Sequence, residues 1–199
     1  MKFLIINGPN LNMLGIREPD LYGTLTYDGL VEYVAAEARR LGVEAEFYQS
    51  NHEGDLVTAI QQAYGRMDGI VINAGAYTHT SIAILDALKA VSVPAAEVHI
   101  SDVAKREDFR QVSYLGMACC CKFAGEGKQG YVHAMEKLIE IIRSKKYLEY
   151  KKSYSVPHGN GMRRRWAAPA ARRAVIQQAE GKESNDHQHK TGHSGGGTG

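Results

Sequence analysis

Long apolar runs are missing from this chain of 199 residues. No stretch approaches the roughly 18 consecutive apolar residues that a membrane-spanning helix needs, so we expect no membrane-spanning segment. The first residues, Met1 to Phe3, enter an apolar segment at once, without the ordered regions of a secretory signal peptide. The sequence therefore predicts a cytoplasmic protein that does not act at a membrane.

Cysteine is also scarce, with three residues at Cys119, Cys120 and Cys121. Adjacent residues of one strand cannot build a disulfide framework, and an odd number fits a reducing compartment. We expect all three to be buried inside a strand, with a reactive thiol as the alternative. Near the end of the chain, the histidines at 187, 189 and 193 have no folded frame around them. No metal site is therefore expected.

The net charge of +2 conceals two unlike segments. Residues 1–150 contain 15 Lys and Arg against 19 Asp and Glu, whereas residues 151–199 contain 9 against 3. The second segment also lacks apolar periodicity and is rich in turn residues, which is typical of disorder. We expect a folded domain at 1–148 and a basic, glycine-rich, mostly disordered extension at 149–199, in which 166–178 is a candidate short helix.

Within the folded part, short apolar runs alternate with segments of helical period. The pattern predicts five strands, at 2–7, 43–49, 69–73, 94–98 and 117–123. It predicts longer helices at 26–41, from 54 on, at 81–91 and at 131–146, and a short one at 105–110; Thr26 is the expected first N-cap. Such alternation indicates βαβ units. Five strands favour an α/β, flavodoxin-like fold, a parallel sheet of order 2-1-3-4-5 with helices on both faces.

The connection between the first strand and the first helix is unusually long. Such connections usually have about 2–6 residues, but this one extends from Asn7 to Gly23. It carries Asn, Arg, Glu and Tyr side chains between three glycines. Long loops in compact domains are usually functional. We interpret this loop as an active-site lid whose glycines allow the backbone to bend.

Polar residues follow three neighbouring strands of the expected sheet. Asn7 and the lid follow the first strand, Asn73 to Ser81 follow the third, and His99 to Asp102 follow the fourth. In doubly wound sheets, ligands bind beyond the carboxyl ends of the strands, where the strand order reverses. The sequence therefore predicts a small-molecule site at this edge, beside the first and third strands.

Three motifs make up this edge. They are Gly-Pro-Asn-Leu-Asn at 8–12 with Arg-Glu-Pro at 17–19 and Leu-Tyr-Gly at 21–23; Asn73 with Gly-Ala-Tyr-Thr-His-Thr-Ser at 75–81; and Glu-Val-His-Ile-Ser at 97–101 with Arg106, Glu107 and Arg110. In these motifs the chain, from residue 3 to about 145, resembles the type II 3-dehydroquinate dehydratases. The resemblance implies a lyase without a cofactor that dehydrates 3-dehydroquinate to 3-dehydroshikimate in the shikimate pathway. It also implies a homo-oligomer, typically a dodecamer built as a tetramer of trimers.

The resemblance further implies roles for individual residues. Tyr22 matches the family's base, Arg17 an essential arginine that favours the tyrosine's phenolate, and His99 the general acid. Asn12 matches a residue that helps to hold an enolate, and Glu97 is a reasonable partner for His99. The residues that match the substrate-binding set are Asn73, His79, Asp86, Ile100, Ser101 and Arg110, with Asp86 supporting a neighbouring subunit's site.

Other features leave alternatives open. Gly125 to Gly130 spells G-x-G-x-x-G, but no strand follows it, so no nucleotide cofactor is expected. Ala74, Leu85 and Asp102 stand where the family commonly has Pro, Arg and Asn. The alternative functions are a catalytically silent flavodoxin-like binding or scaffold protein that uses its basic tail, and an enzyme for a different ring substrate. Nucleic acid is not expected as a partner.

Overall fold

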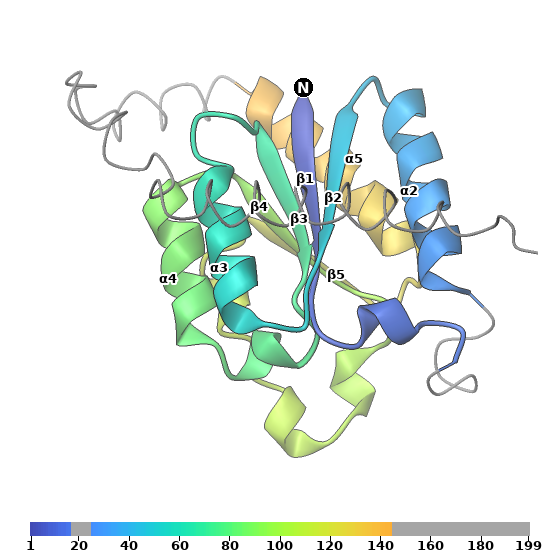
Figure 1. The fold of residues 1–199 in the computed structure, drawn as a ribbon, viewed down its shortest axis with the longest axis vertical. Coiled ribbons are helices and arrows are strands. Elements are labelled where there is room, and N and C mark those ends of the chain that lie inside the picture. The colour runs from blue at the N-terminus through green and yellow to red at the C-terminus, as the bar shows by residue number, and fades with distance from the viewer. Residues whose placement is uncertain (17–24, 145–199) are drawn as a thin grey trace, which may run out of the picture. The chain divides into compact units, whose positions relative to one another are not determined.

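The computed structural model describes residues 1–16 and 25–144. A five-stranded sheet with the order β2-β1-β3-β4-β5 forms its centre (Figure 1). The strands are Lys2–Asn7 (β1), Glu44–Gln49 (β2), Gly69–Asn73 (β3), Ala95–His99 (β4) and Cys121–Ala124 (β5). All neighbouring strands are parallel. The predicted flavodoxin-like fold and its strand order are confirmed.

Helices cover both faces of the sheet (Figure 1). The α-helices of the described residues are Tyr27–Arg40 (α2), Glu53–Gln62 (α3), Ile82–Val91 (α4) and Gln129–Arg143 (α5). Alternate side chains of β1 separate two cores. Phe3 and Ile5 pack with α2 and α5, whereas Leu4 and Ile6 pack with α3 and α4. None of these helices is long and apolar enough to cross a membrane.

Side-chain caps determine where two of the helices begin. Thr26 Oγ1 accepts a hydrogen bond from the Gly29 N–H at 3.1 Å, and Ser81 Oγ accepts one from the Ile84 N–H at 2.9 Å. Each bond satisfies an amide that has no partner within its own helix. The predicted N-cap at Thr26 is confirmed. Apart from β5 and the short helix at 105–110, each predicted strand and helix begins within two residues of its prediction.

The prediction of a strand over 117–123 is wrong at its start. A 3-10 turn, η5 (Leu115–Met117), comes first. The backbone carbonyl of the buried Leu115 accepts hydrogen bonds from two of the amides that follow. The chain therefore turns before it can pair with β4, and pairing begins only at Cys121.

The three cysteines are correspondingly less buried than predicted. Cys120 is exposed, Cys119 and Cys121 are partly buried, and all three are free thiols. Of the three, Cys121 alone lies in β5. The prediction that they are buried together inside a strand is therefore wrong, because the turn at η5 shortens the strand and leaves Cys119 and Cys120 before it.

The short helix predicted at 105–110 is also wrong. Two separate 3-10 turns, η3 (Val103–Lys105) and η4 (Asp108–Arg110), take its place. Asp102 caps the first turn by accepting a hydrogen bond from the Ala104 N–H at 3.1 Å. The Gln111 side chain contacts three carbonyl oxygens of this region, including that of Arg106 at 3.0 Å. These side chains satisfy the backbone groups that a continuous helix would use.

Other predictions fall outside the described residues. They concern the domain boundary at 148/149, the extension with its candidate helix at 166–178, and the end of the last helix.

Two further turns follow strands at the predicted site. They are the 3-10 turns η1 (Leu11–Met13) after β1 and η2 (Gly75–His79) after β3.

Gly8 lies where the chain leaving β1 passes closest to the end of β3. Its amide donates a hydrogen bond to the Asn73 carbonyl at 2.7 Å. A Cβ at this position would lie 2.4 Å from the backbone oxygen of Ala74. Because backbone atoms cannot give way as a flexible side chain can, we expect Gly8→Ala to lower the free energy of unfolding by about 3 kcal/mol, measured by urea denaturation.

Gly54→Ala is the matched control for that measurement. A Cβ at Gly54, in the first turn of α3, would have no atom within 4 Å. Its stability should be unchanged or slightly raised, because alanine favours a helix more than glycine does. Equal stability of the two variants would contradict the close approach at Gly8.

Candidate functional site

A cleft of about 180 Å³ opens at the carboxyl edge of the sheet, where β1, β3 and β4 end. It is lined by the loops that follow these three strands. The predicted site residues that line it are Asn73, His79, His99, Ile100, Ser101 and Arg110. The cleft therefore lies at the sheet edge that the polar clusters of the sequence indicated, and the segments after β3 and β4 bring these residues together.

Arg17 and Tyr22 are outside the described residues, and three other predicted site residues do not line the cleft. Asn12 is exposed in η1, and Asp86 is exposed on α4, and neither lines the cleft. Glu97 is fully buried and does not line the cleft either. The described part of the site is therefore its sheet edge with the first part of the lid, where Asn10, Leu11 and Leu14 line the cleft.

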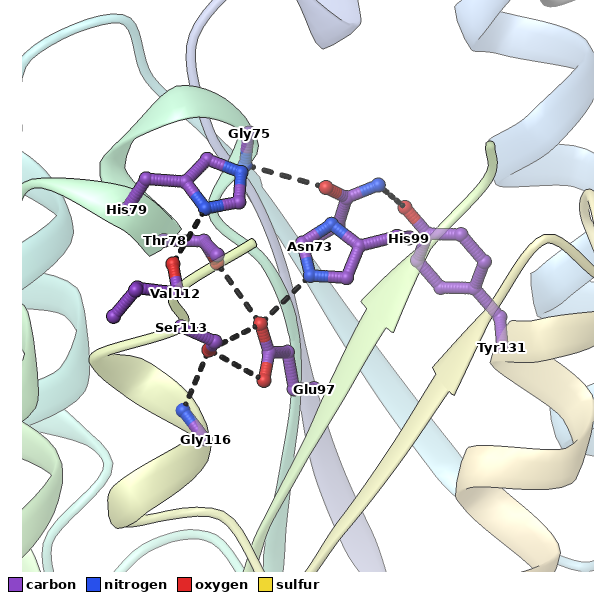
Figure 2. A network of polar contacts seen from close by, with 10 residues as sticks. All are labelled: Asn73, Gly75, Thr78, His79, Glu97, His99, Val112, Ser113, Gly116 and Tyr131. Atoms are coloured by element: carbon purple, nitrogen blue, oxygen red, sulfur yellow. Dashed lines mark hydrogen bonds and ion pairs between the residues drawn. The ribbon is translucent and has the colours of Figure 1, made fainter. Parts of the chain in front are cut away.

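The Glu97 side chain has 0% exposure to solvent, and its carboxylate forms several hydrogen bonds (Figure 2). Its Oε1 lies 3.2 Å from Thr78 Oγ1 and 2.7 Å from His99 Nε2. Ser113 Oγ lies 2.8 Å from Oε1 and 2.9 Å from Oε2. Burial alone would raise the pKa of Glu97, but the bonds from His99 and Ser113 outweigh it and hold the pKa below its usual value. Glu97 is therefore an ionised acceptor.

The two histidine rings of the cleft lie nearly parallel, with centroids 6.3 Å apart and planes 16° apart (Figure 2). His79 Nδ1 lies 2.7 Å from the Val112 carbonyl oxygen, which can only accept, so Nδ1 carries a proton. By the same argument, His99 Nε2 carries the proton that it donates to Glu97. The nitrogens left for other partners are therefore His79 Nε2 and His99 Nδ1.

Burial also affects the charge of His79. It lowers the pKa of the ring, while the hydrogen bond to the Val112 carbonyl opposes this effect. His99 and Arg110 lower the pKa further by repulsion. At neutral pH, His79 is thus an uncharged ring, suited to hydrogen bonding with a polar ligand rather than to holding an anion.

The Asn73 side chain forms a hydrogen bond with Tyr131, a buried residue of α5 (Figure 2). Tyr131 donates its O–H to Asn7 Oδ1 at 2.6 Å and accepts from Asn73 Nδ2 at 3.1 Å. Asn73 Oδ1 accepts a further hydrogen bond from the Gly75 N–H at 3.2 Å. Burial raises the pKa of Tyr131, so the hydroxyl keeps its proton. These bonds fix the Asn73 amide at the end of β3.

Arg110 brings a positive charge to the cleft from η4. Its Nε donates to Glu107 Oε2 at 2.9 Å, and its guanidinium carbon lies 5.2 Å from the centre of the Phe109 ring. A guanidinium held in this way suits a carboxylate or hydroxyl ligand. Asp102, a departure from the family pattern, is engaged locally, because it caps η3 and pairs with Lys105 at 3.5 Å.

Sequence reasoning missed the residues that support the cleft from the interior, namely Thr78, Ser113 and Tyr131. Thr78 lies inside one of the quoted motifs, beside His79, and that position was an available signal. Ser113 and Tyr131 gave no signal, because serine is common in turns and the tyrosine reads as part of the apolar face of α5. Their contacts join segments far apart in the chain, as the Tyr131–Asn7 bond shows.

No metal centre is present in residues 1–16 and 25–144, where no three His, Cys, Asp or Glu side chains converge. The histidines at 187, 189 and 193 lie outside these ranges. A second hollow of about 100 Å³ lies between β2 and α3. Its two charged residues, Glu46 and Arg66, pair with each other at 3.0 Å. The cleft at the carboxyl edge is therefore the better candidate site.

Comparison with known proteins points to one family. The family model described as Dehydroquinase class II matches residues 1–139. A 3-dehydroquinate dehydratase of Fusobacterium nucleatum is 54% identical over 143 residues, which cover 70% of this chain and 97% of that protein. One from Caldicellulosiruptor bescii is 49% identical over 142 residues, covering 71% of this chain and 98% of that protein.

Solved structures agree with these relatives. The crystal structure of a type II dehydroquinase from Butyrivibrio crossotus is 50% identical, with a TM-score of 0.68, and the match covers 70% of this chain and 97% of that one. A type II dehydroquinase from Propionibacterium acnes is 40% identical, with a TM-score of 0.67, covering 70% and 96%. The similarity therefore spans nearly the whole of each relative.

The Tyr131 hydroxyl offers a direct test of the support behind Asn73. Tyr131→Phe leaves Asn7 and Asn73, which are 2% and 4% exposed, each without one hydrogen-bond partner. We expect the free energy of unfolding to fall by about 2 kcal/mol, measured by urea denaturation at one protein concentration. Tyr64→Phe, at an exposed tyrosine, is the matched control and should be neutral. A neutral Tyr131→Phe would contradict this role.

Proposed function

The chain belongs to the class II dehydroquinase family, and we propose that it dehydrates 3-dehydroquinate to 3-dehydroshikimate. The observation that carries the proposal is the pairing of His99, in the cleft, with the buried carboxylate of Glu97 at 2.7 Å. Asn73, His79 and Arg110 line the same cleft. Relatives that are 49–54% identical over this part of the chain bear the name 3-dehydroquinate dehydratase.

The reaction removes a proton next to a ketone, forms an enolate and expels a hydroxyl as water. It needs a base, an oxyanion stabiliser and an acid. We assign the base to Tyr22. A free tyrosine has a pKa of about 10, so only about one in a thousand is ionised at pH 7, a penalty of roughly 4 kcal/mol. The Arg17 guanidinium, on the same lid, would favour the phenolate and reduce this penalty.

We assign the acid to His99. Its Nε2–H donates a hydrogen bond to the Glu97 carboxylate at 2.7 Å, and this bond fixes the orientation of the ring. The remaining nitrogen, Nδ1, can then deliver a proton to the departing hydroxyl group, which leaves as water. The proposed elimination proceeds with anti geometry, without a cofactor or a metal.

The remaining predicted residues take binding roles in the proposal. Asn12 helps to hold the enolate oxygen. The side chain of Ser101, the backbone at Ile100 and the guanidinium of Arg110 bind the substrate's hydroxyl and carboxylate groups. Two further cleft residues, Asn73 and His79, also bind substrate. Their fixed orientations support this role, because an amide and a neutral ring held in place lose little freedom when a ligand binds.

We also propose that the enzyme acts in the shikimate pathway, in the cytoplasm, as a dodecamer formed as a tetramer of trimers. Asp86 would support the site of a neighbouring subunit. Ile82, one turn earlier on α4, is 57% exposed, and Met117 of η5 is 65% exposed. Exposed apolar side chains near a proposed interface residue support a subunit contact on this face. The same chemistry would also serve quinate breakdown.

Turnover of 3-dehydroquinate tests the proposed activity. We expect the purified full-length protein to generate enone ultraviolet absorbance in the presence of a metal chelator and without added nucleotide. Tyr22→Phe should lower kcat by at least about a hundred-fold, because general-base catalysis contributes about that much or more. Tyr64→Phe provides the matched control and should keep full activity, because this tyrosine follows α3 in the chain and is exposed.

The outcomes separate the functions considered for this chain. Absence of turnover in the unmodified protein would contradict the dehydratase and leave the silent binding or scaffold protein and the enzyme for a different ring substrate. Full activity of Tyr22→Phe would keep the activity but remove Tyr22 as the base.

The native mass tests the proposed assembly. Because one chain has a mass of 21.9 kDa, we expect native mass spectrometry to give about twelve times that value. Ile82→Lys places a charge on the exposed face of α4 and should shift the population to smaller assemblies. A monomer in the unmodified protein, or an unchanged mass in the variant, would argue against the proposed interface.

A further inference from the structure

Val112 and Ser113, in the segment after η4, lie beside His79 and Glu97 (Figure 2). The carbonyl of Val112 accepts the hydrogen bond from His79 Nδ1 at 2.7 Å. The next residue, Ser113, contacts the Glu97 carboxylate. This one segment therefore contacts His79 directly and His99 through Glu97.

The Ser113 hydroxyl has one proton, and its surroundings direct that proton to Glu97. The Gly116 N–H donates to Ser113 Oγ at 2.9 Å, so the oxygen acts as an acceptor there and its own hydrogen is left for another partner. Ser113 Oγ lies 2.8 Å from Glu97 Oε1 and 2.9 Å from Oε2, so its hydrogen is available to either carboxylate oxygen. Among the described donors, Ser113 is the one that reaches both carboxylate oxygens.

The other donors act on one oxygen of Glu97. Thr78 Oγ1, at 3.2 Å, and His99 Nε2, at 2.7 Å, both address Oε1. The orientation of the carboxylate plane, and with it the position of Oε1 against His99, therefore depends on the bond that Ser113 makes to Oε2. A buried carboxylate without this bond would be both less fixed and more costly to keep charged.

Among the described residues, His99 and Lys122 of β5 act by their charge to lower the pKa of Glu97. The charge of Glu97 in turn opposes the lowering of the His79 pKa by burial, and it adds to burial in raising the pKa of the Cys119 thiol. Lys122 is exposed, so solvent screens its effect. The buried hydroxyl contacts are thus an important part of what keeps this carboxylate ionised.

We infer that Ser113 is a positioning residue for the proposed dehydration: its hydroxyl holds the Glu97 carboxylate in the orientation and charge state in which it accepts the hydrogen bond from His99 Nε2–H. Ser113 itself touches no substrate and acts through Glu97. The inference rests on the proposed function, in which His99 is the acid.

Ser113→Ala tests the inference through the pH profile of kcat. The variant removes a donor that lowers the pKa of Glu97, so this pKa rises and Glu97 becomes protonated at higher pH. We expect the acid limb of the kcat profile to move up by about one pH unit. We also expect kcat to fall about ten-fold or more with KM within about two-fold, because the loss affects the proton transfer rather than binding.

Two variants separate positioning from simple destabilisation. Ser113→Thr keeps the hydroxyl and should restore the acid limb to its original position. Ser81→Ala is a matched serine variant that removes the N-cap bond of α4 at 2.9 Å without touching Glu97; it should lower Tm and leave the pH profile unchanged. An unmoved acid limb in Ser113→Ala, or an equal shift in Ser81→Ala, would overturn the inference.

A second readout does not depend on turnover. A carboxyl whose folded-state pKa is lowered contributes stability above its unfolded pKa, and this contribution is lost as the pH falls through the folded-state value. The Tm difference between the unmodified protein and Ser113→Ala should therefore shrink as the pH is lowered through the titration of Glu97. A Tm difference that does not change with pH would contradict the role of Ser113 in keeping Glu97 ionised. Absence of turnover in the unmodified protein would contradict only the proposed function.

Discussion

The burial of the Glu97 charge is the constraint on which the site depends. A carboxylate without solvent would normally become neutral, because burial disfavours the charged form. Here the compensating donors come from η2, from β4 and from the segment after η4, through Thr78, His99 and Ser113. These segments meet only in the folded protein, so the charge beneath the cleft and the geometry at its rim are established together.

The parallel sheet explains why such different segments meet at one edge. β1, β3 and β4 lie side by side, and the register pairs Asn7 with Asn73 at the ends of β1 and β3. Each strand therefore releases its following loop at the same level. The apolar strands supply a rigid base, and the asparagines that end β1 and β3 lie opposite each other. A site for a polar ring substrate needs such a base, because its donors and acceptors must be held before the ligand arrives.

Local patterns predicted the elements whose burial is uniform. The strands at 2–7 and 69–73 agree with the structure because apolar runs buried on both faces leave little choice of conformation. The prediction failed at 117–120, where the backbone bonds of Leu115 outweigh an apolar run, and it did not find Ser113, whose contact is with a carboxylate on β4. Motifs identified the residues of the cleft, but long-range contacts select those that hold them in place.

The hydrogen bond between Tyr131 and Asn7 joins residues 124 positions apart. During synthesis, β1 leaves the ribosome long before the last helix does, and its terminal asparagine has to wait for a partner that is among the final parts of the domain to appear. The cleft is therefore completed only when α5 docks, and a nascent chain interrupted before that helix carries the family's motifs without a finished binding site. Contacts of such high sequence separation slow folding, and they also keep an incomplete translation product from presenting a working pocket.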